Sequence, residues 1–350
     1  MDELTAPRLE MSRARYQQNL AALQRQLAPS QLMVVMKDDA YGHGVEWAVD
    51  AAVEAATPVA LFGGYDVSTA LRIRARAPQA RIFVWVTSPD DEIRTALASD
   101  IDLGVGTLPY LRRIVAVARD VGTTARVHLK IDTGLHRNGV RPEDWPAFIA
   151  EAMAAQNDGV IDVVGVWSHL AEASDAEDDD AAAEFARAVA SLESAGARPV
   201  ARHLTASAAS WWRPELRGSV SRIGAFCYGV RSADGPEIPG VAPVAALRAP
   251  VIDVLDDHVV ISVGALHGIP STIAGASVGT PGGARVLRHV GAVTSAVEVW
   301  PGARQGQDVT VFGPGADGES DATALAERID TVGEEILTRL TPRVRRVVTD

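Results

Sequence analysis

Polar side chains end several short apolar stretches of this 350-residue chain, and one of them is a lysine. Lys37 directly follows the apolar run 33–36. A lysine in that place loses hydration, which frees its amine for Schiff-base chemistry with an aldehyde. A lysine that merely extends its ammonium group to solvent explains this residue alone equally well. Other candidates at such ends are Tyr41, Lys130, Arg137, His169, His203, Ser207, Arg222 and Gly224.

Together these candidates favour a site for pyridoxal phosphate. Gly224 can expose backbone N–H groups to a phosphate, and the hydroxyl groups of Ser207 and Tyr41 can add to them. Arg222 can donate to a ring nitrogen or pair with an acid. This cofactor needs an amine for its aldehyde, hydrogen-bond donors for its phosphate and a group such as an arginine beside its pyridine nitrogen. His169 is a candidate acid/base group, although a lone histidine on a strand is more often structural.

Other kinds of site are less favoured. The G-x-S-x-G motif of a serine hydrolase is absent from the sequence. A metal site would have to use His128, His169 and His203, but His128 is expected to lie one layer deeper in the fold than the other two. The single cysteine, Cys227, stands in an apolar run, which predicts a buried structural thiol. One cysteine also excludes an internal disulfide framework.

The elements that must position these residues alternate between strand and helix. Eight strands with intervening helices predict an α/β fold, a (β/α)8 TIM-like barrel whose functional residues gather at the C-terminal ends of the strands. A doubly wound open sheet is the alternative, which the lack of a G-x-G-x-x-G motif after the first strand weakens. The predicted strands are 32–37, 59–63, 81–86, 101–105, 126–132, 163–169, 201–205 and 219–222, and helical periodicity covers 45–56, 108–120 and 181–194.

The composition of the chain changes near residue 235, where a C-terminal β-rich domain is predicted to begin. This gives a cofactor-binding barrel over 10–234 and a β domain over 235–350, with residues 1–9 expected to pack on the β domain. A final helix is predicted over 321–340, with Asp321 as its N-cap. The predicted strands of the β domain are 249–254, 258–263, 284–289, 292–300 and 308–312.

Charge and hydropathy narrow the class of protein. The chain carries 33 Lys and Arg against 45 Asp and Glu, a net charge of −12. This balance argues against nucleic acid as a partner, because phosphate backbones are bound by concentrated basic surfaces. The N-terminus lacks the pattern of a signal peptide, and no apolar stretch reaches the ~18 residues of a membrane helix. A cytoplasmic protein that does not bind membranes is expected.

The motifs resemble those of the alanine racemase family. The stretch 35–44 resembles the cofactor-lysine motif of that family, V-K-A-N-A-Y-G-H-G, with Asp38 and Asp39 in place of Ala and Asn. The resemblance covers nearly the whole chain, and five motifs in the right order are hard to obtain by chance. The other four motifs are 128–139, 168–169, 203–209 and 222–229, and the stretch 335–344 is similar to the family's closing segment.

The resemblance implies a role for each candidate residue. Lys37 would carry pyridoxal phosphate as an aldimine and act as one of two acid/base groups. Arg222 would face the pyridine nitrogen, and His169 would help to place it. Arg137 would contact the ring hydroxyl or the substrate carboxylate, oriented by Lys130, which is often carbamylated in the family. The residues implied to hold the cofactor are Lys37, Tyr41, His169, His203, Ser207, Arg222, Gly224 and Ala225.

The larger departures from the family pattern are concentrated in the β domain. The segment 263–270 is similar to V-G-Y-A-D-G-Y-P, but the preceding V-S-Y-G segment, whose tyrosine is the family's second base, is missing, as is M-D-Q. No tyrosine follows Tyr228. Racemisation removes a proton from one face of Cα and returns it on the other, so a second group is needed. His267 or His258, supplied by a partner chain, is the hypothetical replacement.

The sequence therefore predicts a homodimeric, PLP-dependent amino-acid racemase of the alanine racemase type, an isomerase that interconverts L- and D-amino acids. Its substrate is a small amino acid, and the shortened β domain predicts an entrance wide enough for one larger than alanine. Two alternatives stay open: a PLP enzyme with a single base, for elimination, decarboxylation or transamination, and a PLP-binding homologue without turnover. No metal is expected. The predicted catalytic residues are Lys37, Arg137, His169 and Arg222.

Overall fold

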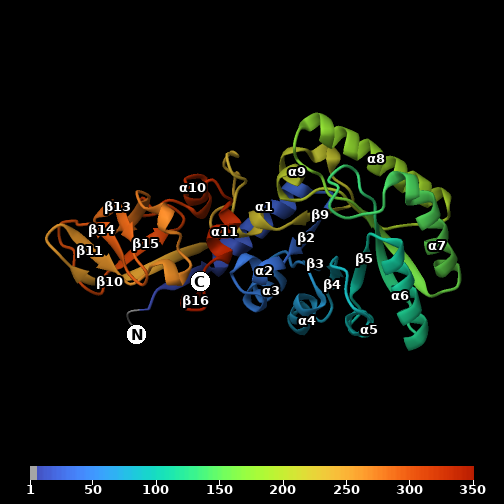
Figure 1. Ribbon diagram of the computed structural model, residues 1–350, viewed down its shortest axis with the longest axis horizontal. Helices are drawn as coiled ribbons and strands as arrows, with labels where there is room; N and C mark the ends of the chain where they lie inside the picture. The colour runs from blue at the N-terminus through green and yellow to red at the C-terminus, as the bar shows by residue number, and fades with distance from the viewer. Residues whose placement is uncertain (1–5) are drawn as a thin grey trace. The chain divides into compact units, whose positions relative to one another are not determined.

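The computed structural model describes residues 6–350, which form two compact units (Figure 1). The barrel unit consists of Leu23–Lys37 and Val53–Gly224. The β unit consists of 6–22, Asp38–Ala52 and Ala225–Asp350. Because the chain passes between the units more than once, the predicted division at residue 235 stays a prediction. Residues 1–5 of the N-terminal stretch expected to pack on the β domain lie outside the described residues.

Eight parallel strands make up the sheet of the barrel unit, in the order β8-β7-β6-β5-β4-β3-β2-β9. The backbone N–H of Arg222 in β9 donates to the carbonyl of Thr205, just past β8, at 3.3 Å, so the two ends of the sheet meet. The predicted (β/α)8 barrel is confirmed. The strands are β2 (Gln31–Val35), β3 (Leu61–Gly64), β4 (Arg81–Val84), β5 (Asp102–Val105), β6 (Ala125–Lys130), β7 (Ile161–Trp167), β8 (Ala201–His203) and β9 (Val220–Ile223).

Helices follow most of these strands and lie on the outer side of the sheet (Figure 1). Asp66, Thr107 and Ser174 each begin a helix by accepting a hydrogen bond from a backbone N–H of its first turn. None of the helices within residues 6–350 has the length and apolar character of a membrane span. The helices are α1 (Arg13–Leu27), α3 (Val45–Val53), α4 (Val67–Arg76), α5 (Asp90–Ala98), α6 (Leu108–Val121), α7 (Trp145–Asn157), α8 (Asp175–Ser194) and α9 (Ser207–Trp212).

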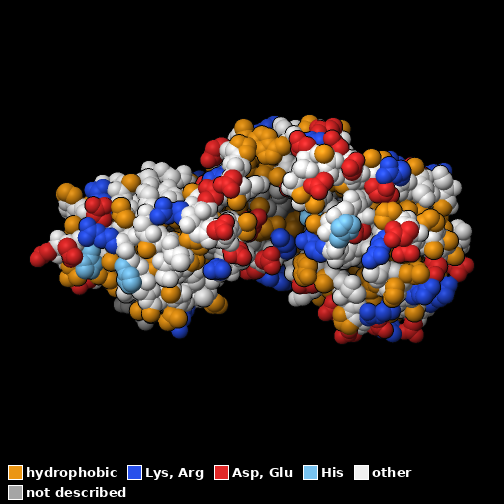
Figure 2. Space-filling model, turned by 45° about the horizontal axis from the view of Figure 1, so that its top comes forward, with side chains coloured by type: hydrophobic (Ala, Val, Ile, Leu, Met, Phe, Trp, Pro, Cys, Tyr) orange, Lys and Arg blue, Asp and Glu red, His pale blue; other side chains and the backbone are white. Residues whose placement is uncertain are grey.

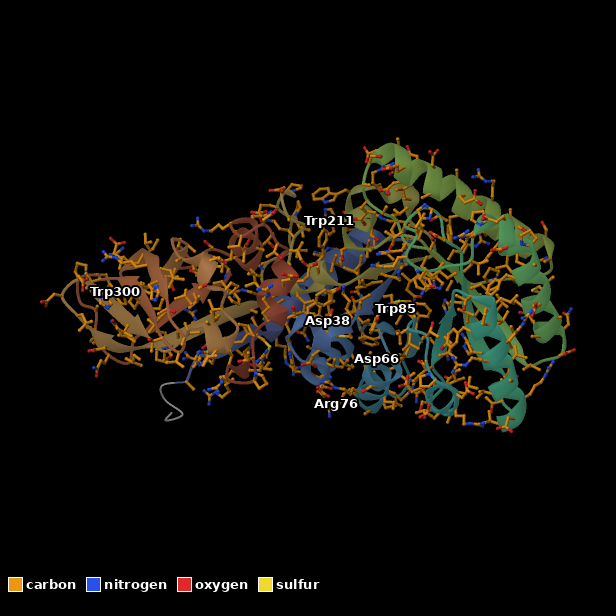
Figure 3. All side chains as sticks on the ribbon, viewed as in Figure 1. Asp38, Asp66, Arg76, Trp85, Trp211 and Trp300 are labelled. Atoms are coloured by element: carbon orange, nitrogen blue, oxygen red, sulfur yellow. The ribbon has the colours of Figure 1, made fainter. Side chains whose placement is uncertain are left out.

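An apolar cluster fills part of the barrel unit. Met33, Phe83, Trp167 and Val220 are buried together, one from each of four strands. Trp85, just past β4, packs against this cluster and lies among the strands (Figure 3). Inward-pointing side chains of different strands therefore meet in a packed core, as they do in barrels of this class.

Polar residues share the interior with this core. Alternation along β6 puts Arg126, His128 and Lys130 on one face of the strand. The register of β6 against β7 shifts between Val127 and His128, which marks a β-bulge. His128 and Lys130 are 3% and 4% exposed, so the strand carries buried polar groups at successive depths.

The sheet of the β unit is mostly antiparallel. Its order is β11-β14-β13-β12-β15-β10-β1-β16, and β10 also pairs with β11. The strands β1 and β16 were not predicted, because each is short and pairs with a segment from the other end of the chain. The strands are β1 (Arg8–Ser12), β10 (Ala245–Val254), β11 (His258–Ile261), β12 (Ser277–Thr280), β13 (Gly283–Val290), β14 (Ser295–Glu298), β15 (Asp308–Phe312) and β16 (Arg345–Thr349).

The prediction of one helix over 321–340 is wrong. Asp321 caps the start as predicted, accepting a backbone N–H of the first turn at 2.6 Å. The helix ends early, however, as α10 (Ala322–Glu327), and a second helix, α11 (Gly333–Thr338), follows. Asp330 between them has a φ of 55°, a left-handed conformation that a continuous right-handed helix cannot contain.

A left-handed turn, α2 (Lys37–Tyr41), directly follows the end of β2. Asp38, Asp39 and Ala40 have φ values of 52°, 54° and 55°, and Asp38 is labelled in Figure 3. A left-handed helical conformation costs an L-residue about 1–2 kcal/mol, so contacts elsewhere must hold the turn. One of them is the hydrogen bond from the N–H of Val45, at the start of α3, to Oδ1 of Asp39 at 3.2 Å.

Candidate active site

Arg222 on β9 is held by three backbone carbonyls. Its guanidinium donates to the carbonyl oxygens of His203, Ser168 and Leu204 at 2.7, 2.8 and 3.0 Å. The residue is only 5% exposed. Burial lowers the pKa of Arg222 to about 9, and the carboxylate of Glu172 offsets part of that effect. Arg222 therefore keeps its proton at neutral pH and can donate to a neighbouring acceptor without losing it.

His169 lies just past the end of β7, against Arg222. Its Nδ1 is 3.2 Å from Nη2 of Arg222, and since a guanidinium can only donate, Nδ1 is the acceptor. Burial and then the positive charges around it, beginning with Arg222, lower the pKa of His169 to about 3. The imidazole is therefore neutral and carries its proton on Nε2.

Lys37 and Lys130 are the only two lysines in the sequence, and both belong to the barrel unit. Lys130 ends β6 with its Nζ 4.4 Å from the centre of the Trp167 ring. Burial, and then the charges of two nearby arginines, Arg222 first, lower the pKa of Lys130 to about 8. Lys37 is half-buried at the end of β2, and its charge contributes to the lowered pKa of His169.

Arg137 is exposed in the loop after β6, beside a cavity of about 730 Å³. Among residues 6–350, neither Arg137 nor Asp180 in α8 has an ion-pair partner. The cavity lining mixes the two signs of charge and includes Thr133, Arg137, Arg141, Asp180, Glu184 and Arg187. The rim of the barrel unit thus carries an unpaired guanidinium next to open space.

Two hydroxyl groups each pair with a backbone N–H. In the barrel unit, Oγ of Ser207 accepts from the N–H of Gly224 at 3.1 Å. In the β unit, the backbone of Ala225 hydrogen-bonds the Tyr41 hydroxyl, whose ring centre lies 5.2 Å from that of Tyr228. Burial raises the pKa of Tyr41 well above its ordinary value, so its hydroxyl stays neutral. Hydroxyls and backbone N–H groups are the donor types that bind phosphate.

His128 and Asp102 lie next to the site, and the sequence analysis did not predict either of them as a site residue. Nδ1 of His128 lies 2.8 Å from Nε2 of His203, although the two were expected at different depths. Nε2 of His128 lies 3.3 Å from Oδ2 of Asp102. The polar alternation on β6 was the signal that could have found this contact. Because the two imidazoles bond each other directly, no metal ion fits between them.

The connection between β10 and β11 is too short for the family's V-S-Y-G segment. The N–H of Leu255 donates to the carbonyl of His258 at 2.9 Å, which closes a tight hairpin. His258 is half-buried, with Nδ1 2.7 Å from Oδ1 of Asp257. His267 is completely buried, and its Nδ1 accepts the N–H of Gly264 at 3.1 Å. Of the two histidines, only His258 is placed where another molecule can reach it.

Comparison with known proteins assigns the chain. The family descriptions "Alanine racemase, N-terminal domain" and "Alanine racemase, C-terminal domain" match residues 11–232 and 257–348. This chain belongs to the alanine racemase family. The alanine racemase of Beutenbergia cavernae is 35% identical over 360 residues, 94% of each chain. That of Thermobifida fusca is 32% identical over 95% of each chain.

The solved structure of an alanine racemase from Streptomyces lavendulae has the same fold, with a TM-score of 0.92 at 31% identity over 99% of this chain and 97% of that one. The alanine racemase family is pyridoxal phosphate dependent, so the predicted cofactor and the predicted amino-acid racemase class are confirmed. The alternatives of a single-base enzyme and of a homologue without turnover are not favoured.

The residues present fit this cofactor. Within the barrel unit, two amines, a buried cationic guanidinium and the Ser207–Gly224 hydroxyl–amide pair match its aldehyde, ring nitrogen and phosphate. On the face drawn in Figure 2, acidic and basic side chains are interspersed over the barrel unit. Arg112–Glu151 and Arg119–Asp158 are two of the ion pairs of this unit. A single extended basic surface is not seen on that face.

Proposed function

We propose that Lys37 holds the cofactor through its amine and that Arg222 donates to its pyridine nitrogen. When bound, pyridoxal phosphate draws electron density from Cα of an amino acid, which makes the Cα proton acidic. Nζ of Lys37 exchanges that proton on one face of Cα. The observation that carries this proposal is that the charge of Lys37 acts on His169, which lies against an Arg222 that three carbonyls hold in place.

The phosphate and the ring are held by separate groups. The hydroxyls of Tyr41 and Ser207 and the backbone N–H groups of Gly224 and Ala225 bind the phosphate. Ser207 is hydrogen-bonded to the N–H of Gly224, and Tyr41 to the backbone of Ala225, so each pair already presents a hydroxyl beside an amide. His169 and His203 contribute to cofactor binding by holding Arg222, because each accepts a hydrogen bond from its guanidinium.

The substrate is an amino acid with a side chain larger than a methyl group. Arg137 binds its carboxylate or the ring hydroxyl, since its guanidinium has no ion-pair partner within residues 6–350. Lys130 orients Arg137 from the end of β6. The cavity of about 730 Å³ beside Arg137 supplies room for the side chain, and its charged lining favours a polar one.

The second proton-transferring group is His258, supplied by the other copy in a homodimer. Its imidazole stands where the family's tyrosine segment is deleted, and the Asp257 carboxylate 2.7 Å away orients it. An imidazole has both a donor and an acceptor nitrogen, so it can give or take a proton at Cα. We also propose the division into a barrel domain over 10–234 and a β domain over 235–350.

Spectroscopy of the protein reconstituted with pyridoxal phosphate tests the role of Lys37. We expect a visible absorption band that Lys37→Ala abolishes. Lys130→Met is the matched control, because it removes the other amine while keeping an apolar side chain against Trp167, and the band should persist. A wild-type protein without such a band would remove the cofactor role of Lys37.

Incubation with single L- and D-amino acids in heavy water tests the role of His258. The wild-type enzyme should place deuterium at Cα and form both enantiomers. His258→Ala should lower racemisation by about 10²- to 10⁴-fold, the usual worth of one acid/base group, while exchange from one enantiomer continues. His267→Ala should change neither. Equal racemisation by wild type and His258→Ala would rule out this assignment.

A further inference from the structure

Four polar side chains form a hydrogen-bonded series through the interior of the barrel unit. The proposed function uses only two of them, Arg222 and His203. The series joins Arg222 on β9, His203 on β8, His128 on β6 and Asp102 on β5. These residues are 5%, 0%, 3% and 4% exposed. Buried polar groups almost always have hydrogen-bond partners, so the direction of each bond can be worked out. We call His203, His128 and Asp102 the relay.

Arg222 fixes the direction of every bond in the relay. A guanidinium has only donors, so Nδ1 of His203, 3.1 Å from Nη1 of Arg222, is an acceptor. His203 therefore carries its proton on Nε2 and donates it to Nδ1 of His128 at 2.8 Å. His128 then carries its proton on Nε2, which faces Oδ2 of Asp102 at 3.3 Å. Burial lowers the pKa of His203 well below its ordinary value, in agreement with a neutral ring.

Asp102 is held ionised at the far end of the relay. Its Oδ1 accepts from Arg81 at 2.5 Å and from Arg126 at 2.9 Å. Burial by itself would raise the pKa of Asp102, but the hydrogen bonds from His128 and Arg126 outweigh it and hold the pKa at about 2. Asp102 is the first residue of β5, so this charge lies at the end of the barrel opposite Lys130.

Aromatic rings and a glycine hold the two imidazoles in place. The Trp167 ring stacks on His203 with centres 5.7 Å apart and an angle of 7° between the planes. Phe83 contacts both imidazoles, with ring centres 4.6 Å from His128 and 5.1 Å from His203. Gly165 leaves the space that the His128 ring occupies. These contacts favour the ring orientations in which the two imidazoles face each other.

We propose that Asp102 is a positioning residue that fixes Arg222 through the two histidines. The negative charge of Asp102 favours the tautomer of His128 that has its proton on Nε2. Without that charge, the tautomers in which both imidazoles carry their proton on Nδ1 become competitive. Nδ1–H of His203 then faces an N–H of Arg222, which places two donors against each other. Arg222 loses an acceptor and shifts away, because a buried donor left without a hydrogen-bond partner is unfavourable. The consequence for catalysis rests on the proposed function of Arg222, whereas the tautomers do not.

Asp102→Asn, compared with Asp100→Asn, tests the relay in the cofactor-free protein. Asp100 binds the same Arg81, at 2.8 Å, but makes no contact with the relay, so its substitution is the matched control. Long-range ¹H–¹⁵N spectra of histidine-labelled protein should show single tautomers for His128 and His203 in the wild type and in Asp100→Asn. Asp102→Asn should populate the second tautomer of both rings. Unchanged tautomers in Asp102→Asn would overturn the proposal.

The reconstituted enzyme supplies the second readout. Asp102→Asn should shift the visible absorption maximum and lower kcat about tenfold, as loss of an outer-shell partner does, with KM nearly unchanged. Asp100→Asn should do neither. If Asp102→Asn fails to fold, His128→Asn keeps an acceptor for His203, cuts the link to Asp102 and should give the same two effects. If Asp102→Asn alters the tautomers but leaves the visible absorption spectrum unchanged, Asp102 does not act on Arg222. If the wild-type enzyme does not racemise amino acids, only the proposed function is rejected.

Discussion

The imidazole of His128 on β6 occupies the space in which a side chain on Gly165 of β7 would stand. Gly165→Ala should therefore push the ring out of the barrel interior and lower the free energy of unfolding by about 1–3 kcal/mol, the usual cost of overpacking. Urea denaturation measures the change. Gly64→Ala is the control, because its nearest atoms are 3.3 Å from the new Cβ. A Gly165→Ala variant as stable as the wild type would show that His128 can move at no cost.

Ser207 contributes to cofactor binding more than to folding. Ser207→Ala should weaken pyridoxal phosphate binding by about 1.5–3 kcal/mol, because a hydrogen bond to a charged group is lost. A titration followed by the visible absorption band gives the dissociation constant. Ser210→Ala, on the same helix, removes the buried bond from Ser210 Oγ to Thr205 Oγ1 at 2.7 Å. That control should lower thermal stability and leave the dissociation constant unchanged.

The left-handed turn after Lys37 can be relieved by glycine. Ala40 is completely buried with a φ of 55°, and glycine adopts this conformation without a Cβ penalty. Ala40→Gly should therefore leave stability unchanged or raise it by about 1 kcal/mol. Ala48→Gly, in the middle of α3, should lower it by about 1 kcal/mol. Chemical denaturation of the two variants decides, and a loss of stability in both would mean that the turn is unstrained.

Buried neutral histidines make the protein sensitive to acid. Burial lowers the pKa of His43 to about 4, and burial with nearby cations lowers that of His169 to about 3. Below pH 6.5 the unfolded chain takes up protons that the folded one does not, so stability falls as the pH drops from 6.5 towards 4. At pH 5 each histidine should cost about 2 kcal/mol. His43→Gln should reduce the slope of unfolding free energy against pH by one proton, and a flat wild-type profile would contradict this.

Local patterns in the sequence determined much of this molecule. The eight barrel strands follow from short apolar runs, the capping of α10 from Asp321, and the buried thiol of Cys227 from its apolar neighbours. The same patterns brought Lys37 and Arg222 to one unit, because parallel strands place their C-terminal ends at one rim. These features depend on residues close together in the chain, which is why the sequence alone suffices for them.

Only the tertiary structure decided the rest. Asp102, His128 and His203 are far apart in the sequence, and which nitrogen faces which oxygen depends on strand register and on the bulge between Val127 and His128. The strand β1 and the break at Asp330 depend likewise on distant partners and on one backbone angle. Hydrogen bonds require donor and acceptor to lie about 3 Å apart. The packing of the strands, and not a pattern along the chain, brings Asp102, His128 and His203 within that distance.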